Sequence, residues 1–216
     1  MKIISFSLVL SLLLSFLPGC SNKKNKKEET PVITAPDSSR LNIMDNKVNP
    51  YAIVDVSPMD ISYFPADYPK LKMENASVGP PLARIIYSRP HLQGRKLFLT
   101  LLKYEEPWRL GANESTELDL YSDAIIQEKR IKAGRYVLYS IPHTDTWTIV
   151  LNTNIDSWGL HPDSTRDIAR FTIPVKKTSN QLEYYTMLFE KTASGADIIM
   201  AWDDLEARLP VIFMEK

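Results

Sequence analysis

From residue 82 onward, apolar and polar positions follow the patterns of β-strands. Residues 116–121 and 147–152 alternate between polar and apolar side chains, which is the period of a half-buried strand. Ala133-Gly134 separates two apolar segments and predicts a hairpin. Predicted strands elsewhere in this region are residues 83–88, 96–102, 125–131, 136–141, 169–175, 182–190, 197–202 and 209–213. About nine strands at regular spacing predict an all-β fold, an antiparallel β-sandwich resembling a jelly roll. The only helical turn that we expect is at residues 203–208.

Proline dominates the segment that precedes these strands. Eight of the 15 prolines lie between Pro31 and Pro81. Because proline fixes φ and lacks an N–H donor, we expect neither a regular helix nor a central strand there. Residues 51–75 are nevertheless too apolar for a free linker. We therefore predict an extended N-terminal arm that lies on the domain and includes an edge strand.

The amino terminus has the features of an export signal. Lys2 precedes the apolar stretch 3–17, which is too short for a stable membrane-spanning helix. Leu17-Pro18-Gly19-Cys20 resembles the lipobox of bacterial lipoproteins, and Cys20 is the only cysteine in the sequence. We predict a signal peptide at residues 1–19 and acylation of Cys20 with palmitate-type chains, which anchors the protein to a membrane. The alternative is an ordinary cleaved signal peptide with a chance cysteine.

Residues 20–50 lack any apolar period and are predicted to be a disordered tether. Four lysines in residues 23–27 are followed by Glu28 and Glu29, a pattern that suits either a solvated spacer or a surface-sorting signal. The expected organisation is a signal peptide at 1–19, an acylated tether at 20–50 and one β-sandwich domain at 51–216. The expected location is the cell envelope, at the outer membrane, with the domain facing the periplasm or the cell surface.

Composition narrows the chemistry. Lys plus Arg and Asp plus Glu both number 26, so the formal charge is zero and gives no general affinity for nucleic acid. The three histidines have no metal-ligand spacing, and the sequence contains neither a Gly-x-Ser-x-Gly elbow nor a glycine-rich phosphate loop. We therefore expect no nucleic acid partner, no metal and no cofactor.

The densest group of polar residues lies between residues 87 and 116. The candidate ligand-binding residues there are Arg89, Arg95, Trp108, Arg109, Asn113 and Glu114, with Trp158 added from a later loop. An arginine fork suits a carboxylate or phosphate, and a tryptophan face suits a sugar or a cation. The alternative is structural: one arginine pairs with Glu114 or Asp60, and Asn113 caps loop backbone.

Within this group we expect Glu114 to hold one arginine and Arg95 to face solvent. Trp147 and Trp202 alternate with apolar neighbours and are predicted core residues. Trp158 lies in a predicted loop, where its ring could either anchor the loop or provide a face on which a ligand stacks, and the sequence favours neither role.

The chain resembles the bacterial domain of unknown function 2911 family. The residues that carry the resemblance are Ser57-Pro58-Met59-Asp60, Tyr87-Ser88-Arg89-Pro90, Gly94-Arg95, Trp108-Arg109-Leu110-Gly111-Ala112-Asn113-Glu114, Lys132-Ala133-Gly134-Arg135-Tyr136, Trp147-Thr148-Ile149, Asn152, Trp158-Gly159 and Ala201-Trp202. The resemblance covers residues 57–213. It implies a single envelope domain and no particular activity.

Three functions fit these observations. The one that we favour is a non-catalytic envelope domain that binds a small polar or anionic ligand, a glycan or a protein partner. The second is a glycan hydrolase with Glu114 as its acid or base. The third is a structural subunit of an outer-membrane assembly.

Overall fold

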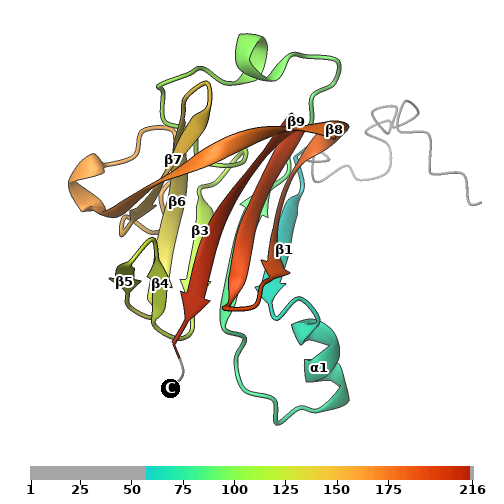
Figure 1. The fold of residues 1–216 in the computed structure, drawn as a ribbon, viewed down its shortest axis with the longest axis vertical. Coiled ribbons are helices and arrows are strands. Elements are labelled where there is room, and N and C mark those ends of the chain that lie inside the picture. Colours follow the sequence, from blue (N-terminus) through green and yellow to red (C-terminus); the bar gives the residue numbers. More distant parts are fainter. Residues whose placement is uncertain (1–56, 215–216) are drawn as a thin grey trace, which may run out of the picture. The chain divides into compact units, whose positions relative to one another are not determined.

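The computed structural model describes residues 57–214, and these residues form an antiparallel β-sheet with short helical turns (Figure 1). The strands are β1 (Met59–Phe64), β2 (Ala83–Ser88), β3 (Thr116–Leu120), β4 (Ala124–Ile126), β5 (Lys129–Ile131), β6 (Gly134–Pro142), β7 (Thr146–Asn152), β8 (Asp167–Lys191) and β9 (Ala196–Phe213). The helical elements are α1 (Tyr68–Glu74), the π-helical turn η2 (Leu97–Leu101) and the 3-10 turn η3 (Ser164–Arg166).

All nine strands belong to one open sheet, in the order β1-β2-β3-β6-β7-β8-β9-β4-β5. Every neighbouring pair is antiparallel. The predicted all-β antiparallel class is confirmed. The sheet is continuous, however, and does not divide into two separately hydrogen-bonded sheets.

The continuity comes from the β8–β9 hairpin, whose strands have 25 and 18 residues. We predicted four separate strands in this region and a helical turn at residues 203–208, which lie within β9. The turn prediction is wrong because residues 203–208 remain extended against β8. Two register shifts interrupt the pairing of the hairpin and let its long strands bend.

The second register shift brings β8 against the loop that follows β2. Residues 183–185 leave β9, and the Tyr185 N–H donates to the Pro90 carbonyl at 2.9 Å while Leu92 N–H donates to the Glu183 carbonyl at 3.0 Å. Further along β8, the Phe189 N–H donates to the Ser62 hydroxyl on β1 at 3.3 Å. The sheet thus curls until β8 lies beside its first strand, as Figure 1 shows.

The curled sheet encloses one hydrophobic core that is rich in aromatic rings. Trp147 is 0% exposed and Trp202 is 2% exposed, which confirms both as core residues. Trp108 joins them: its ring centroid lies 5.6 Å from that of Trp147, 4.9 Å from that of Tyr185 and 5.8 Å from that of Trp202. Buried aromatic residues contribute strongly to stability because each removes a large apolar area from water.

The prediction for the N-terminal arm is confirmed for the edge strand. It is wrong in excluding a helix. Strand β1 stands at the end of the sheet order, as expected for an edge strand. Residues 68–74 form α1 despite their proline, because Pro69 occupies the first turn, where its missing N–H has no intrahelical partner to lose. The remainder of the arm, residues 51–56, lies outside the described residues.

Two further strand predictions are wrong. Residues 97–101 form the turn η2, in which Leu97 is buried and Leu99 is 79% exposed, so this apolar run is not a strand. Residues 125–131 are divided by Gln127 and Glu128, whose φ angles of 44° and 65° form a tight hairpin turn. Strand β5 therefore pairs with β4, and the expected hairpin about Gly134 does not form.

The predicted signal peptide, acylated Cys20 and tether lie outside the described residues. In residues 57–214, no helix has the length and apolar character needed to cross a bilayer.

Candidate functional site

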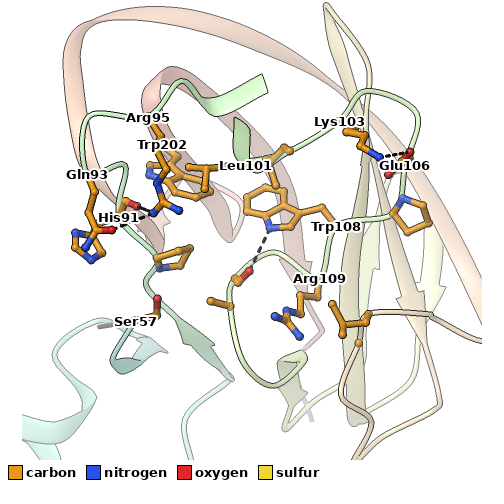
Figure 2. A pocket seen from close by; sticks show the side chains of 17 residues that line it. Ser57, His91, Gln93, Arg95, Leu101, Lys103, Glu106, Trp108, Arg109 and Trp202 are labelled. Carbon is orange, nitrogen blue, oxygen red and sulfur yellow. Dashed lines mark hydrogen bonds and ion pairs between the residues drawn. The ribbon is translucent and has the colours of Figure 1, made fainter. Parts of the chain in front are cut away.

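A cavity of about 480 Å³ lies where three loops meet (Figure 2). One loop follows β2, one runs from η2 to β3, and one joins β7 to η3. Arg95, Trp108 and Arg109 line this cavity, so the structure brings together three of the seven predicted site residues. The other four predicted residues, Arg89, Asn113, Glu114 and Trp158, are not part of its lining.

Trp108 and Trp202 supply the apolar side of the cavity. Their rings are stacked at 26° and both residues are largely buried. The indole Nε1–H of Trp108 donates to the Gly111 carbonyl at 3.2 Å, which fixes the ring orientation. A ligand would meet a rigid apolar wall there, because both rings are already packed in the core.

Arg109 is held against the loop that contains Trp158. Its Nη1 donates to the Trp158 carbonyl at 3.0 Å, and its guanidinium carbon lies 5.8 Å from the Trp158 ring centroid. Partial burial lowers the pKa of Arg109, and the charge of Glu114 opposes that shift. Trp158 is 56% exposed and provides a face for the guanidinium, so the structure shows how this tryptophan contacts a cation of its own chain.

Gly159 allows the two loops to approach closely. A Cβ atom at Gly159 would lie 2.5 Å from the Ser115 Oγ and 3.0 Å from the Arg109 Cβ. The φ of Gly159 is +79°, in the left-handed region that favours glycine. The Ser115 hydroxyl also donates to the Ser157 carbonyl at 2.7 Å, which ties the same two loops together.

Arg95 approaches the cavity from the loop after β2, on a different side from Arg109 (Figure 2). The side chain is exposed, as expected, but it is also fixed by its own loop. Its Nε donates to the Leu92 carbonyl at 2.8 Å and its Nη2 donates to the His91 carbonyl at 2.9 Å. Hydrogen bonds to carbonyl groups orient the guanidinium without neutralising its charge.

Arg89 has the structural role that we gave as the alternative. It forms an ion pair with Asp60 at 3.3 Å. Its Nε donates to the Tyr185 carbonyl and its Nη2 donates to the Thr186 hydroxyl, both at 3.2 Å. Arg89 thereby joins β1 to β8 and helps to hold the curled sheet.

We expected Glu114 to hold an arginine, and the structure shows that it does not. Across the described part of the chain it makes no ion pair within 4 Å, and its influence on Arg109 is through space. The reason is that the Arg109 side chain turns toward the Trp158 loop. Asn113, with a φ of 58°, donates from Nδ2 to the Ser57 carbonyl at 3.4 Å, which agrees with the expected backbone contact.

The cavity lining carries more positive than negative charge. Three cationic side chains, Arg95, Lys103 and Arg109, stand against one carboxylate, that of Glu106. Lys103 and Glu106 pair with each other at 3.1 Å. Within residues 57–214, neither Arg95 nor Arg109 forms an ion pair with a carboxylate, and no group of three His, Cys, Asp or Glu side chains could hold a metal ion.

A comparison with protein-family models finds one match. The model described as "Protein of unknown function (DUF2911)" matches residues 69–211. The chain belongs to the DUF2911 family. The resemblance noted in the sequence is confirmed, and the match spans every described residue of the cavity lining except Ser57. No curated protein and no solved structure matches this DUF2911 chain.

Sequence reasoning about this DUF2911 domain missed part of the cavity lining. Trp202 was assigned to the core alone, yet it also faces the cavity, and His91 and Leu160 were not singled out as site residues. These residues come from strands and loops that the curled sheet brings together, so no local pattern marks them as neighbours. Arg95, Trp108 and Arg109 belong to one polar segment of the sequence, which is why these three lining residues were recognised as a group.

Proposed function

We propose that this DUF2911 chain is a cell-envelope lipoprotein whose domain binds a small anionic ligand that also has an apolar part. The observation that carries the proposal is the placement of two arginines that have no carboxylate partner among residues 57–214, beside a wall of buried tryptophan. No catalytic step is part of the proposal.

The charge of the lining favours an anion. Lys103 and Glu106 neutralise each other, which leaves the guanidinium groups of Arg95 and Arg109 as the excess charge. Both are fixed by hydrogen bonds to backbone carbonyls, so little side-chain freedom is lost when a ligand binds. A carboxylate or phosphate accepts the remaining guanidinium N–H groups and supplies the missing negative charge.

The apolar wall and the size of the cavity indicate the rest of the ligand. Leu102, Trp108 and Trp202 are buried residues that reach the lining. A volume of about 480 Å³ falls in the range of roughly 300–1,000 Å³ that is typical of small-molecule sites. An organic anion with a hydrophobic body fits this combination better than inorganic phosphate.

The arrangement of carboxylates supports binding over glycan hydrolysis. Glycosidases generally use two carboxyl groups that face each other across the scissile bond. Among the described lining residues only Glu106 has a carboxylate, and that group is paired with Lys103. Glu114, the acid or base expected for a hydrolase, stands outside the lining.

The envelope location rests on the sequence alone. The apolar stretch before Leu17-Pro18-Gly19-Cys20 and the single cysteine support export and acylation. A lipid-anchored binding domain would then sample small molecules at the membrane surface.

Thermal unfolding of the full chain, purified in detergent, tests the binding role. A panel of aliphatic and aromatic carboxylates, organic phosphates and inorganic phosphate is added, because a ligand that binds the native state raises Tm. We expect an organic anion to raise Tm, and Arg109→Gln and Arg95→Gln each to weaken its binding about tenfold, as the loss of one charged hydrogen bond implies. The matched control is Arg130→Gln, an exposed arginine on β5 outside the lining. No effect of any anion, or equal binding by Arg109→Gln and the wild-type chain, contradicts the proposal.

A further inference from the structure

We infer that a second groove in this domain binds a neutral oligosaccharide. The groove has a volume of about 960 Å³ and shares no described residue with the anion cavity. Its walls come from η2 and the turn after it, from the β6–β7 turn, and from the middle of the β8–β9 hairpin. The inference does not depend on the proposed function, because it concerns different residues and a different chemistry.

One wall of the groove is an aromatic platform. Phe98 and Tyr104 stack with their ring centroids 4.1 Å apart and their planes within 6° of parallel. Tyr104 is 43% exposed and Phe98 is partly buried against the core, so the inner ring supports the outer ring. The apolar face of a pyranose ring packs on a flat aromatic surface of this kind, and the platform needs no rearrangement to receive it.

Another part of the groove lining is a polar bulge of β8. Lys177 pairs with Leu205, the next pairing joins Leu182 to Asp203, and residues 178–181 therefore stand opposite Asp204 alone. The backbone of residues 178–181 lacks the regular pairing with β9 that the flanking residues have. Thr178, Ser179 and Gln181 line the groove. The Thr178 hydroxyl donates to the Asn180 carbonyl at 2.8 Å and the Gln181 amide donates to Asp203 at 2.7 Å, so both side chains are held in place. Hydroxyl and amide groups of this kind suit sugar hydroxyls.

Asp203 is fixed at the same bulge. Its φ is 55°, and its Oδ1 accepts a hydrogen bond from the Gln181 amide at 2.7 Å. The other oxygen, Oδ2, accepts no hydrogen bond from another described residue. A carboxylate oxygen held in this way can accept hydrogen bonds from two neighbouring hydroxyls of a sugar ring.

The charges of the lining favour a neutral ligand over an ion. Lys96 and Lys177 oppose the binding of a cation, and Asp145, Asp203 and Asp204 oppose the binding of an anion. Lys177 and Asp204 are paired at 3.3 Å and neutralise each other. The Asp203 carboxylate is oriented by Gln181, and most of the other polar side chains of the lining are uncharged. A neutral, polyhydroxylated chain satisfies both the platform and the bulge without burying a like charge.

Calorimetric titration of the full chain in detergent with cellopentaose, xylopentaose, maltopentaose and chitopentaose tests the inference. We expect at least one to bind with a Kd below about 10 mM. Tyr104→Ala and Asp203→Asn should each weaken that binding about tenfold, the effect expected for one stacking contact or one charged hydrogen bond. Asparagine tolerates the left-handed φ of Asp203, so Asp203→Asn keeps the backbone of the bulge.

Two controls keep the result interpretable. Tyr104→Phe retains the platform and should bind like the wild-type chain even if Tyr104→Ala perturbs folding. Tyr68→Ala removes a tyrosine that lines neither cavity and should leave binding unchanged. Absence of binding for all four sugars overturns the inference. Equal binding by Tyr104→Ala, Asp203→Asn and the wild-type chain also overturns it, because the sugar would then occupy another surface. Binding of an organic anion at Arg109 is measured in a separate experiment. Its outcome does not depend on whether a sugar binds the second groove, because the two sites share no described residue.

Discussion

Arg109 and Trp158 contact each other twice, through a hydrogen bond of 3.0 Å from Nη1 to the Trp158 carbonyl and through a guanidinium that lies 5.8 Å from the indole ring centroid. These contacts join the loop before β3 to the loop after β7. They also keep a cation at the cavity wall, where no carboxylate of the described residues binds it. The position of the Trp158 loop therefore decides whether Arg109 faces the cavity.

Replacing the buried Trp202 and replacing the exposed Trp158 should have very different effects on stability. Trp202→Ala removes a core ring and should lower the free energy of unfolding by about 3–5 kcal/mol. Trp158→Ala removes a half-exposed ring and a cation–π contact, and should cost only about 1 kcal/mol or less. Urea denaturation of both variants measures the difference, and similar losses would contradict the assignment of Trp158 to the surface.

Gly159→Ala should destabilise the protein by more than about 1 kcal/mol, since it adds a steric clash to the backbone strain of a positive φ. Gly94→Ala is the matched control, because Gly94 has a φ of +72° and no atom within 4 Å of the added Cβ. The excess loss in Gly159→Ala over Gly94→Ala, measured by urea denaturation, reports the contact with Ser115. If the two glycines prove equivalent, the close approach of the loops is wrong.

Arg89 and Glu114 should also behave differently on truncation. Arg89→Ala leaves the Tyr185 carbonyl and the Thr186 hydroxyl without this donor and should cost roughly 1–3 kcal/mol. Glu114→Ala removes an exposed side chain that has no direct partner in the described part of the chain, and it should change stability by no more than about 0.5 kcal/mol. Chemical denaturation of both variants distinguishes the two roles. A large loss of stability in Glu114→Ala would show that Glu114 does make a stabilising contact, as the sequence had suggested.

Asp123 should contribute to the acid sensitivity of the fold. The Ala133 N–H, Arg130 and Lys132 all bond to its carboxylate and hold the pKa of Asp123 well below its usual range. A depressed pKa in the folded state gives stability that is present above the unfolded value of about 4 and is lost as the pH falls through the folded value. Asp123→Asn should therefore reduce the loss of stability between pH 6 and pH 3. An unchanged difference in the urea midpoint between these two pH values would show that the cluster does not contribute.

Cys20→Ser tests the proposed lipid anchor. Without the thiol, no diacylglycerol can be attached, and we expect either a soluble periplasmic species or an unprocessed precursor. Fractionation of the producing cells, with the mass of the mature chain measured, provides the readout. A Cys20→Ser chain that is cleaved and still sediments with membranes would rule out the lipoprotein assignment.

The sequence by itself determined the all-β class, the core positions of Trp147 and Trp202, and the family. Alternation of apolar and polar residues reports which side of a strand is buried, and this local signal survives in any antiparallel arrangement. It also marked Trp108 and Arg109 as neighbours in one loop.

The tertiary structure alone decided which residues meet at the two cavities. Where the sheet curls depends on the two register shifts in the β8–β9 hairpin, and a shift in pairing has no signature in the alternation of either strand. The same curl placed Trp202 beside Trp108 and brought Arg89 to the Tyr185 carbonyl and the Thr186 hydroxyl. Arg109 binds the Trp158 carbonyl and not Glu114. These are contacts between segments distant in sequence, and their partners are fixed by the packing of the whole sheet.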